Sequence, residues 1–552
     1  MSAVCGHEAI ALQDKSNQVI DVIIIGAGVA GLTAALHLAE RGLRPLVLEA
    51  DPDRPGGRLK GGVPVEFEHA GQTWRFGTEH GVHGIWSPYR NLQAMLARHL
   101  IRPVFIPAQE EEWIMGLGRW VRRAQMGSAI RDSWVPAPFH YLGLFARPRF
   151  WAMLTLPDIL SMFPLLAGLL SMLSIDPLGE EQPLSGMTMA DFCRGWTPTL
   201  VDFFAGLTRN AMSARVNEIP ASGFVAFLRF YTLLRRDAWA FSYLPVNGGG
   251  SIVEPMVNVL RAFGGEVITG AKVMQLTLAK ALPSFARVSA AGWRVEWQQN
   301  GERPPSPALP PFHGGRESAE AAHVILATDA PAAEALLRAS PDTAEQAARL
   351  RLPVGRPTAI VRLWFDRAPQ SLRAEAGIFT GDFSLDNFFW LHRIYDEYVR
   401  WGRATGGCAI ESHIYGPAEL LAEPDAALLT RAIMDVGRAW PELKEHLIHS
   451  ALTRNEATHT LLHVGLPDEH LGVETPWPYL YCCGDWVRDR NPAMFLERAC
   501  VTGIKVANAV LRDLALEPWP LLSYPQPEAV ARRVEVFMRG VRHVIRQRRE
   551  ME

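Results

Sequence analysis

Near its N-terminus the chain reads Gly26-Ala27-Gly28-Val29-Ala30-Gly31, a G-x-G-x-x-G turn that few folds can use. The turn directly follows an apolar run, residues 19–25, which predicts a buried strand, and it opens a segment with helical spacing, residues 28–41. Residues 45–49 form a second apolar run. Such a strand–helix–strand unit lets the backbone approach a pyrophosphate at the helix N-terminus. The sequence therefore predicts a Rossmann-like dinucleotide site.

Two features after the turn refine this prediction. Glu49 ends the second strand. Its separation from Gly31, the last glycine of the turn, is close to the ~20 residues expected for an acid that binds ribose hydroxyls. An acid at that position disfavours a 2′-phosphate. Gly56-Gly57-Arg58 follows, and it would bring backbone and a guanidinium close to phosphate.

The far end of the chain indicates which dinucleotide is bound. An apolar run at 479–484 predicts another strand, and Gly484-Asp485 follows it at a turn. Asp485 is placed to accept a hydrogen bond from a ribityl hydroxyl, which FAD has and NAD lacks. Pro492 is predicted to open a helix, residues 492–511, whose positive end would face the flavin N1/C2 edge. Two such pieces at opposite ends predict FAD.

Further motifs carry a resemblance to a known family. Thr78-Glu79-His80-Gly81-Val82-His83 is followed by Tyr89-Arg90-Asn91-Leu92, and Leu496-Glu497-Arg498-Ala499 leads to Gly503. Together with the glycine turn and Gly484-Asp485, they resemble the flavin amine oxidase superfamily. Within it, the chain is most similar to the carotenoid desaturases. These include phytoene and ζ-carotene desaturases and the β-carotene desaturase/methyltransferases that form aromatic rings.

The resemblance implies an α/β fold, with a discontinuous Rossmann-like FAD domain and a substrate domain of mixed sheet and helices that forms an apolar tunnel. The FAD domain is predicted to comprise residues 19–90, 246–335 and 474–515. The substrate domain is predicted to comprise residues 91–245 and 336–473, and residues 516–552 are predicted to form a basic tail.

The resemblance also implies roles for single residues. The residues expected to contact FAD are Gly26, Gly28, Ala30, Gly31, Glu49, Ala50, Gly57, Arg58, Thr78, Glu79, Gly81, Val273, Gly484, Asp485, Pro492, Ala493 and Met494. Val273 would lie by the adenine, and the segment from Thr78 to His83 by the flavin ring. His80 and His83 are the catalytic candidates, each as a hydrogen-bond partner or weak base. Their H-x-x-H spacing lacks a third ligand, so no metal is predicted.

The reaction expected from the resemblance is desaturation of a lipophilic polyene, a carotenoid, by hydride transfer to flavin N5. A quinone or similar acceptor would reoxidise the flavin. Carotenoid ring desaturation with methyl migration and redox-neutral isomerisation remain open. More distant alternatives are an amine or tetrapyrrole oxidase and a non-catalytic FAD-binding membrane partner. Flavin amine oxidases usually place a lysine near N5, but residues 92–265 and 353–442 contain none.

Charge and composition bear on partners and location. The 55 basic and 58 acidic side chains give a net charge of −3, which disfavours nucleic acid. Six cysteines without paired spacing and a polar N-terminus predict a cytoplasmic protein. The uncharged stretch 159–175 is too short to span a bilayer, so it predicts either a buried helix or a surface that dips into lipid. The basic amphipathic tail, 531–552, predicts either membrane attachment or a helix packed on its own domain.

Overall fold

A computed structural model of the protein describes residues 20–179, 184–279, 292–300, 315–370, 374–461 and 469–551. Its central feature is a five-stranded parallel sheet in the order β10-β2-β1-β14-β20. These strands are β1 (Val22–Ile25), β2 (Pro45–Leu48), β10 (Glu266–Ile268), β14 (His323–Leu326) and β20 (Leu480–Cys482). Segments from both ends of the chain therefore meet in one sheet, as the sequence predicts.

Both faces of this sheet are covered, which explains its uninterrupted apolar strands. On one face, Val22 and Ile24 share a core with α1 (Val29–Ala39), α10 (Glu254–Ala262) and α16 (Phe495–Asp513). On the other face, Ile23 and Ile25 pack with α11 (Ala330–Ala339) and a three-stranded antiparallel sheet. That sheet consists of β11 (Ala271–Ala279), β12 (Gly292–Gln299) and β13 (Arg316–Ala321).

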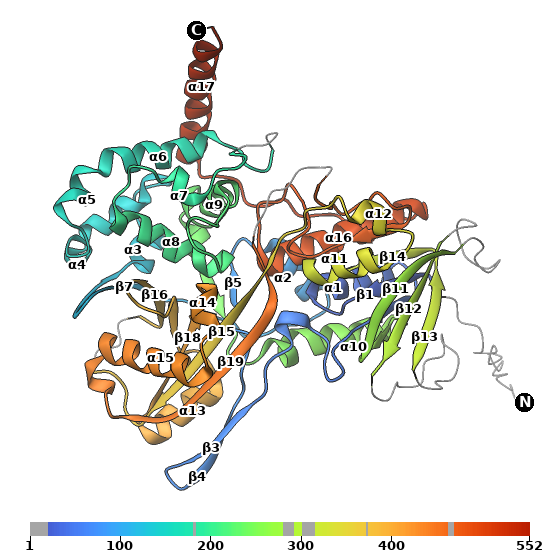
Figure 1. The fold of residues 1–552 in the computed structure, drawn as a ribbon, viewed down its shortest axis with the longest axis horizontal. Coiled ribbons are helices and arrows are strands. Elements are labelled where there is room, and N and C mark those ends of the chain that lie inside the picture. The colour runs from blue at the N-terminus through green and yellow to red at the C-terminus, as the bar shows by residue number, and fades with distance from the viewer. Residues whose placement is uncertain are drawn as a thin grey trace, which may run out of the picture.

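A second, seven-stranded mixed sheet lies beside the first unit (Figure 1). Its order is β19-β15-β18-β17-β16-β7-β8, with β16 and β7 parallel and the other pairs antiparallel. The strands are β7 (Glu111–Leu117), β8 (Trp120–Gln125), β15 (Gly355–Phe365), β16 (Ala376–Gly381), β17 (Asn387–Trp390), β18 (Cys408–Ile414) and β19 (Leu447–Thr460). Helix α15 (Asp425–Ala439) shares a core with this sheet.

Helices from residues 127–228 cover the upper end of the second sheet in Figure 1. They include α3 (Gly127–Arg131), α4 (Pro148–Trp151), α5 (Leu156–Leu160), α6 (Met162–Ser174), α7 (Met189–Phe192), α8 (Pro198–Met212) and α9 (Ala221–Leu228). Within the described residues, no helix is both long enough and apolar enough to cross a bilayer.

The smaller elements connect these layers. They are β3 (Val65–His69), β4 (Gln72–Phe76), β5 (Gly84–Trp86), β6 (Ile106–Pro107), β9 (Phe241–Tyr243), α2 (Arg90–Arg98), α12 (Ala344–Ala347), α13 (Asp396–Thr405) and α14 (Ala418–Leu421). The architecture confirms the predicted fold class, a Rossmann-like unit plus a mixed sheet and helical part. The exact domain boundaries stay a prediction.

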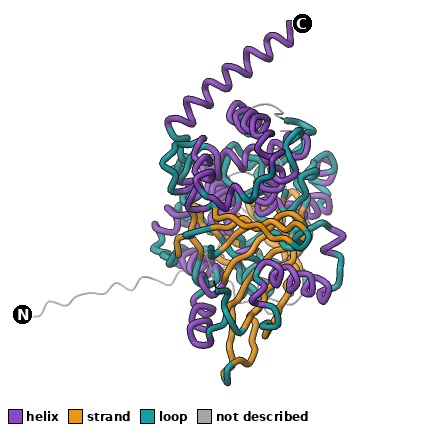
Figure 2. The backbone as a smooth tube through the Cα atoms, turned by 90° about the vertical axis from the view of Figure 1, so that its left-hand side faces the viewer, coloured by secondary structure: helices purple, strands orange, loops and turns teal. Residues whose placement is uncertain are grey.

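The C-terminal helix α17 (Ala529–Met551) projects from the body next to α6 (Figure 1). Figure 2, turned by 90°, shows the same helix standing clear of the rest of the chain. Its first half is anchored, because Glu535 accepts hydrogen bonds from Arg229 at 2.5 Å and Arg539 at 2.8 Å. Arg542 also donates to the carbonyl of Ser174 at 3.1 Å.

Candidate FAD and substrate site

The glycine turn forms the link between β1 and α1. Gly26 has a φ of 106°, and a Cβ there would lie 2.8 Å from the carbonyl oxygen of Ala327. Among the described residues, a Cβ on Gly28 would meet nothing within 4 Å, so the space in front of the helix is open, and no side chain there caps the N-terminus of α1. Its first N–H groups are therefore available to a phosphate. Ala30 and Gly31 are buried in the first turn of that helix.

Glu49 lies at the end of β2, beside the glycine turn. One carboxylate oxygen accepts a hydrogen bond from the N–H of Ala27 at 2.8 Å, and the other from the N–H of Asp51 at 2.9 Å. Each oxygen keeps a lone pair for a ribose hydroxyl. Burial raises the pKa of Glu49. Ala50, the next residue, is exposed, and Val273 lies close by on β11, whose Ala271 N–H donates to the carbonyl of Glu49 at 2.7 Å.

The two ends of the chain meet at Arg58 and Asp485, whose side chains form an ion pair. Gly57 packs against Gly28, because a Cβ on Gly57 would lie 3.4 Å from the Cα of Gly28. Gly484, with a φ of 149°, donates its N–H to Thr502 Oγ1 at 3.0 Å. The structure thus brings the predicted phosphate-binding and ribityl-binding residues together. Arg58 is paired with a carboxylate here, so its predicted contact with phosphate stays a prediction.

The loop before α16 differs from the predicted helix start. The helix begins at Phe495, so Pro492, Ala493 and Met494 lie outside it. Two contacts hold this loop: the Tyr231 hydroxyl accepts from the Met494 N–H at 3.0 Å, and the buried Arg498 donates to the Asn491 carbonyl at 2.7 Å. The helix axis still points its N-terminal end toward this loop.

The contacts of Glu497 give its motif a structural role. Its carboxylate accepts hydrogen bonds from the N–H groups of Asn91 and Leu92 at 2.9 and 3.0 Å. Those N–H groups belong to the first turn of α2, so Glu497 caps one helix from inside another. Gly503 lies further along α16, where a Cβ would be 2.6 Å from the carbonyl oxygen of Ala30. The motif therefore fixes how α16 packs on α1 and α2.

A recess opens where these pieces meet. It is shallow, because most of its roughly 320 Å³ is open to solvent. The residues that line it are Ala211, His459, Thr460, Leu461, Asp485, Trp486, Met494 and Phe495. His459, from β19, was not singled out from the sequence. It brings an imidazole from the second sheet into contact with the FAD-side residues, and burial lowers its pKa to about 4, so it is neutral at pH 7.

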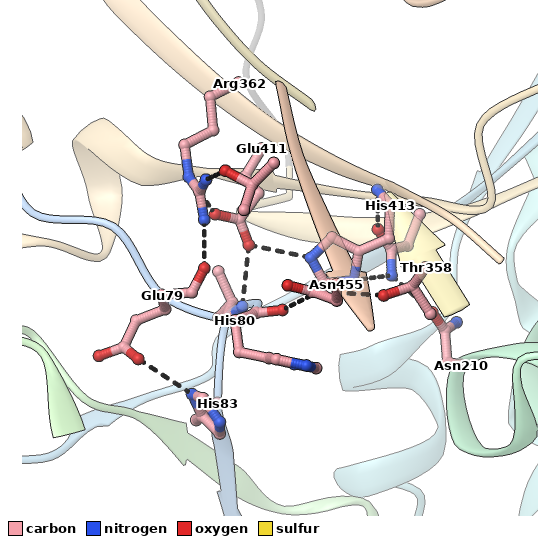
Figure 3. A network of polar contacts seen from close by, with 12 residues as sticks. Glu79, His80, His83, Asn210, Thr358, Arg362, Glu411, His413 and Asn455 are labelled. Atoms are coloured by element: carbon pink, nitrogen blue, oxygen red, sulfur yellow. Dashed lines mark hydrogen bonds and ion pairs between the residues drawn. The ribbon is translucent and has the colours of Figure 1, made fainter. Parts of the chain in front are cut away.

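The segment from Thr78 to His83 runs beneath the second sheet (Figure 3). Thr78 donates its hydroxyl to the Val63 carbonyl at 2.9 Å. Glu79 accepts from the Gly248 N–H at 2.6 Å, and its other oxygen lies 3.9 Å from His83 Nδ1. Burial raises the pKa of Glu79 to about 8. Glu79 therefore holds a proton at pH 7.

The two candidate histidines are both neutral. Burial and the charge of Arg58 lower the pKa of His80 to about 2, and burial lowers that of His83 to about 4. Within the described part of the chain, His80 Nε2 and His83 Nδ1 have no hydrogen-bond partner although they are buried. Such atoms are typical of a site that a ligand completes. The catalytic roles of both residues stay predictions.

A buried ion pair lies directly above this segment. Arg362 on β15 donates to a carboxylate oxygen of Glu411 on β18 at 2.8 Å, and both side chains are only 1% exposed. Arg362 also donates to the Glu79 carbonyl at 2.7 Å, and the other Glu411 oxygen accepts from the Val82 N–H at 2.8 Å. These contacts tie the second sheet to the segment expected to face the flavin (Figure 3).

A second cavity lies among the helices and is lined almost entirely by apolar side chains. It holds about 940 Å³, a figure that includes the space open to solvent at its mouth. Trp113, Pro138, Phe139, Tyr141, Leu142, Leu144, Phe145, Phe150, Leu154, Met162, Leu165, Leu166, Leu169, Leu170, Leu173, Leu200, Phe203, Phe204 and Leu233 line it. Leu142 and Leu166 are themselves exposed, so the cavity opens to the surface beside α6.

Two known protein families match parts of this chain. A profile of NAD(P)-binding Rossmann-like domains matches residues 24–99. A profile of flavin containing amine oxidoreductases matches residues 221–511, more than half of the chain. The chain belongs to the flavin-containing amine oxidoreductase family. It is an FAD-dependent oxidoreductase.

Two relatives match nearly the whole chain of this family member. The carotenoid phi-ring synthase of Streptomyces griseus is 28% identical, over 93% of this chain and 92% of its own. The carotenoid phi-ring synthase of Chlorobaculum tepidum is 22% identical over the same shares, 93% and 92%.

Solved structures share the fold. Cyclohexylamine oxidase from Brevibacterium oxydans IH-35A matches with a TM-score of 0.62 at 15% identity, over 90% of this chain and 99% of its own. An oxidoreductase from Methanosarcina mazei matches with a TM-score of 0.57 at 14% identity, over 88% and 99%. These likenesses establish the architecture of the flavoenzyme.

The geometry fits FAD at the place where the sequence predicts it. The open space at Gly28 and the uncapped N-terminus of α1 fit a pyrophosphate, and the lone pairs of Glu49 fit a ribose. Asp485 lies on the recess at the other end, together with Met494. The pyrophosphate and flavin ends of the cofactor would therefore rest on opposite ends of the chain.

Proposed function

We propose that this flavoenzyme dehydrogenates a cyclic carotenoid end group to an aromatic ring. The observation that carries the proposal is the full-length similarity to two carotenoid phi-ring synthases. The apolar cavity supports it, because a polyene offers no hydrogen-bonding group and needs a binding space lined by apolar side chains. Desaturation of a linear chain is the alternative outcome.

The reaction sets clear demands on the site. Aromatising a ring that has one double bond removes two pairs of hydrogens, each as a hydride and a proton. A ring with a quaternary carbon must also move one methyl group to its neighbour. Bound FAD supplies the hydride acceptor at N5. The protein must hold the ring at the recess, keep water away from the cation and take up the proton.

Helix α8 connects the two spaces that such a substrate would occupy. Phe203 and Phe204 line the apolar cavity, and Ala211 on the same helix lines the recess. At about 1.5 Å per residue, Phe203 and Ala211 are about 12 Å apart along the helix. A polyene lying along α8 would therefore place its chain in the apolar cavity and its terminal ring at the recess.

We also propose that the enzyme works on the surface of an anionic membrane, which would supply both the carotenoid and a quinone acceptor. Phe163 and Leu160, next to the opening of the apolar cavity, are 80% and 74% exposed. Helix α17 projects from the other end of α6, where Arg542 donates to the Ser174 carbonyl, and its Val536, Phe537, Val544 and Ile545 are exposed. Its described basic side chains are Arg532, Arg533, Arg539, Arg542, Arg546 and Arg548. Apolar tips flanked by arginine suit a negatively charged bilayer.

Expression in a host that accumulates cyclic carotenoids tests the reaction. The expected pigment has lost two hydrogen pairs per modified ring, keeps its carbon count, and shows an aromatic end group by NMR. Hydrogen loss confined to the linear chain would replace the proposal with polyene desaturation. An unchanged mass with altered geometric isomers would replace it with isomerisation.

Flotation with lipid vesicles tests the membrane surface. We expect the purified holoenzyme to float with phosphatidylglycerol vesicles and less with phosphatidylcholine vesicles. The double variant Leu160→Ser/Phe163→Ser should lose flotation. The matched control is Val63→Ser, because Val63 is also 80% exposed but precedes β3, away from the helices. Equal flotation of all three proteins would refute the proposed surface.

A further inference from the structure

Three polar side chains follow one another along the end of β18, in the second sheet. Glu411, His413 and Tyr415 are spaced by two residues, so along an extended chain they project to the same side. Glu411 accepts from His413 Nε2 at 2.9 Å, and His413 Nδ1 lies 2.7 Å from the Tyr415 hydroxyl. The side chains therefore form one continuous chain of hydrogen bonds.

The direction of each hydrogen bond follows from Glu411. Burial alone would raise its pKa, but the charge of Arg362 and the hydrogen bond from His413 bring it down to about 2. An ionised carboxylate only accepts, so Nε2 of His413 carries a hydrogen, and in the neutral imidazole Nδ1 is then the acceptor. Two donors lie within reach of Nδ1, the Tyr415 hydroxyl at 2.7 Å and the Asn387 amide at 3.1 Å, and the hydroxyl is the closer. This leaves the Tyr415 oxygen able to accept a further proton.

The outer end of this chain lies beside the recess. The ring of Tyr415 lies 6.4 Å, centroid to centroid, from the ring of His459, which lines the recess. At the other side, a Cβ on Gly81 would lie 2.9 Å from His413 Cε1, so the imidazole packs against the segment expected to face the flavin. Tyr415 is half-buried, whereas Glu411 and His413 are buried.

The backbone and ring of Tyr415 are held in place. Asp386 accepts from the Tyr415 N–H at 2.7 Å, and Arg209 pairs with the same carboxylate at 2.9 Å. The Asn387 amide donates to Asn210 Oδ1 at 2.6 Å, and the same nitrogen lies 3.1 Å from His413 Nδ1 and 3.3 Å from the Tyr415 oxygen. The Tyr415 hydroxyl therefore has His413 Nδ1 as its acceptor at the shortest distance, 2.7 Å.

We propose that Tyr415 and His413 carry the proton away from the substrate during ring dehydrogenation. The inference rests on the proposed function. After a hydride has gone to flavin N5, a neighbouring ring C–H bond breaks and its electron pair forms the new C=C bond. The proton goes to the Tyr415 oxygen, the hydroxyl proton of Tyr415 goes to His413 Nδ1, and the imidazolium is paired with Glu411. Tyr415 is the catalytic residue, and His413 and Glu411 act through it.

The other imidazoles near the recess are less suited to hold a proton. His80 lacks an acidic partner and faces the positive charge of Arg58. His459 uses Nε2 with the Ala211 carbonyl at 2.9 Å and also faces Arg58. His83 lies 3.9 Å from Glu79, which is protonated at pH 7. Only His413, among these four described residues, has a direct hydrogen bond to an ionised carboxylate.

The test compares Tyr415→Phe and His413→Asn with the wild-type holoenzyme, using a cyclic carotenoid in phosphatidylglycerol vesicles. Tyr243→Phe is the matched control, because its buried hydroxyl has no hydrogen-bond partner in the described part of the chain. We expect both relay variants to keep bound FAD and to form aromatic product at least about 100-fold more slowly. The double variant should be no slower than either single one, because the two residues act as a unit.

Product composition separates catalysis from structural damage. When the proton cannot leave through Tyr415, the cation should lose protons elsewhere, so non-aromatic double-bond isomers should rise relative to aromatic product. The relay is refuted if Tyr415→Phe is as fast as Tyr243→Phe. It is also refuted if the rates of formation of all products fall by the same factor, or if Tyr415→Phe loses FAD. The same holds if the rate losses of the two single variants multiply in the double variant. A wild-type enzyme that never dehydrogenates a ring refutes the proposed function instead.

Discussion

Replacing Arg362 by methionine tests whether the buried ion pair holds the second sheet onto the segment from Thr78 to His83. Methionine fills a similar volume without a charge. It leaves Glu411 buried at 1% exposure without its cation, and it removes the hydrogen bond to the Glu79 carbonyl. Burial would then act on the Glu411 carboxylate almost unopposed.

The loss of unfolding free energy in Arg362→Met can be derived from the pKa of Glu411 and from the typical cost of breaking a buried ion pair. Because one pKa unit corresponds to about 1.4 kcal/mol, the fall in the pKa of Glu411 from 4.5 to about 2 stabilises the fold by about 3 kcal/mol at neutral pH. Breaking a buried pair by removing one partner typically costs about 3–5 kcal/mol. We therefore expect Arg362→Met to lower the unfolding free energy by about 3–4 kcal/mol at pH 7, within the range of both routes.

The stability difference between the wild type and Arg362→Met should change with pH in a defined direction. In the wild type, the pKa of Glu411 is depressed, so its contribution is present above pH 4.5 and is lost as the pH falls toward 2. In Arg362→Met, burial raises the pKa of Glu411 above its unfolded value, so the folded state takes up a proton. The stability deficit of the variant should therefore shrink as the pH is lowered from 8 to 6. Arg362 also lowers the pKa of Glu79, so the substitution raises that pKa and changes the pH dependence in the same direction.

The assay is the thermal midpoint of the FAD-loaded protein at both pH values. Arg438→Met is the control, because it breaks a more exposed pair with Asp382, worth at most about 1 kcal/mol. An Arg362→Met protein as stable as Arg438→Met would refute the reasoning, as would a deficit that is equal at pH 6 and pH 8.

Three further predictions concern the cofactor and its helices. Glu49→Ala and Asp485→Ala should each purify with less FAD, measured as flavin absorbance per protein; full retention in both would contradict the placement of the cofactor. Gly503→Ala should cost about 1–3 kcal/mol, since its Cβ would be 2.6 Å from a carbonyl oxygen of α1, whereas Gly540→Ala, in open space, should not lower the thermal midpoint. Glu497→Gln should lower the midpoint by weakening the cap on α2, and an unchanged midpoint would exclude that cap as a source of stability.

The cofactor side of the fold could be predicted because its signals are local. The turn from Gly26 to Gly31 fixes a strand before it and a helix after it, and the structure has both. Asn491 and Pro492 carry the ordinary signals of a helix start, yet the helix begins three residues after Pro492. The reason is tertiary: Arg498 and Tyr231 bind the backbone of the loop and hold it outside the helix.

The substrate side could not be predicted in the same way. Glu411, Ser412 and His413 form a polar run between Ile410 and Ile414, and such a run ordinarily indicates a segment exposed to solvent. Both faces are buried instead, because Arg362 from β15 reaches Glu411 and the segment around Gly81 covers His413. His459 had no local signal, since its position at the recess depends on where β19 ends. Buried polar residues can be recognised only once their partners are known.

The distribution of polarity also bears on how the enzyme would choose its substrate. A carotenoid cannot satisfy buried donors or acceptors, and unpaired ones cost about 1–3 kcal/mol each. The apolar cavity accordingly has an almost entirely apolar lining, with the Tyr141 hydroxyl as an exception. Arg362, Glu411 and His413 are paired with one another. Little hydrogen bonding is left to distinguish a cyclic end group from a linear one. Discrimination would then rest on shape at the recess and on whether a proton can leave there, which places selectivity in the same few residues as the chemistry.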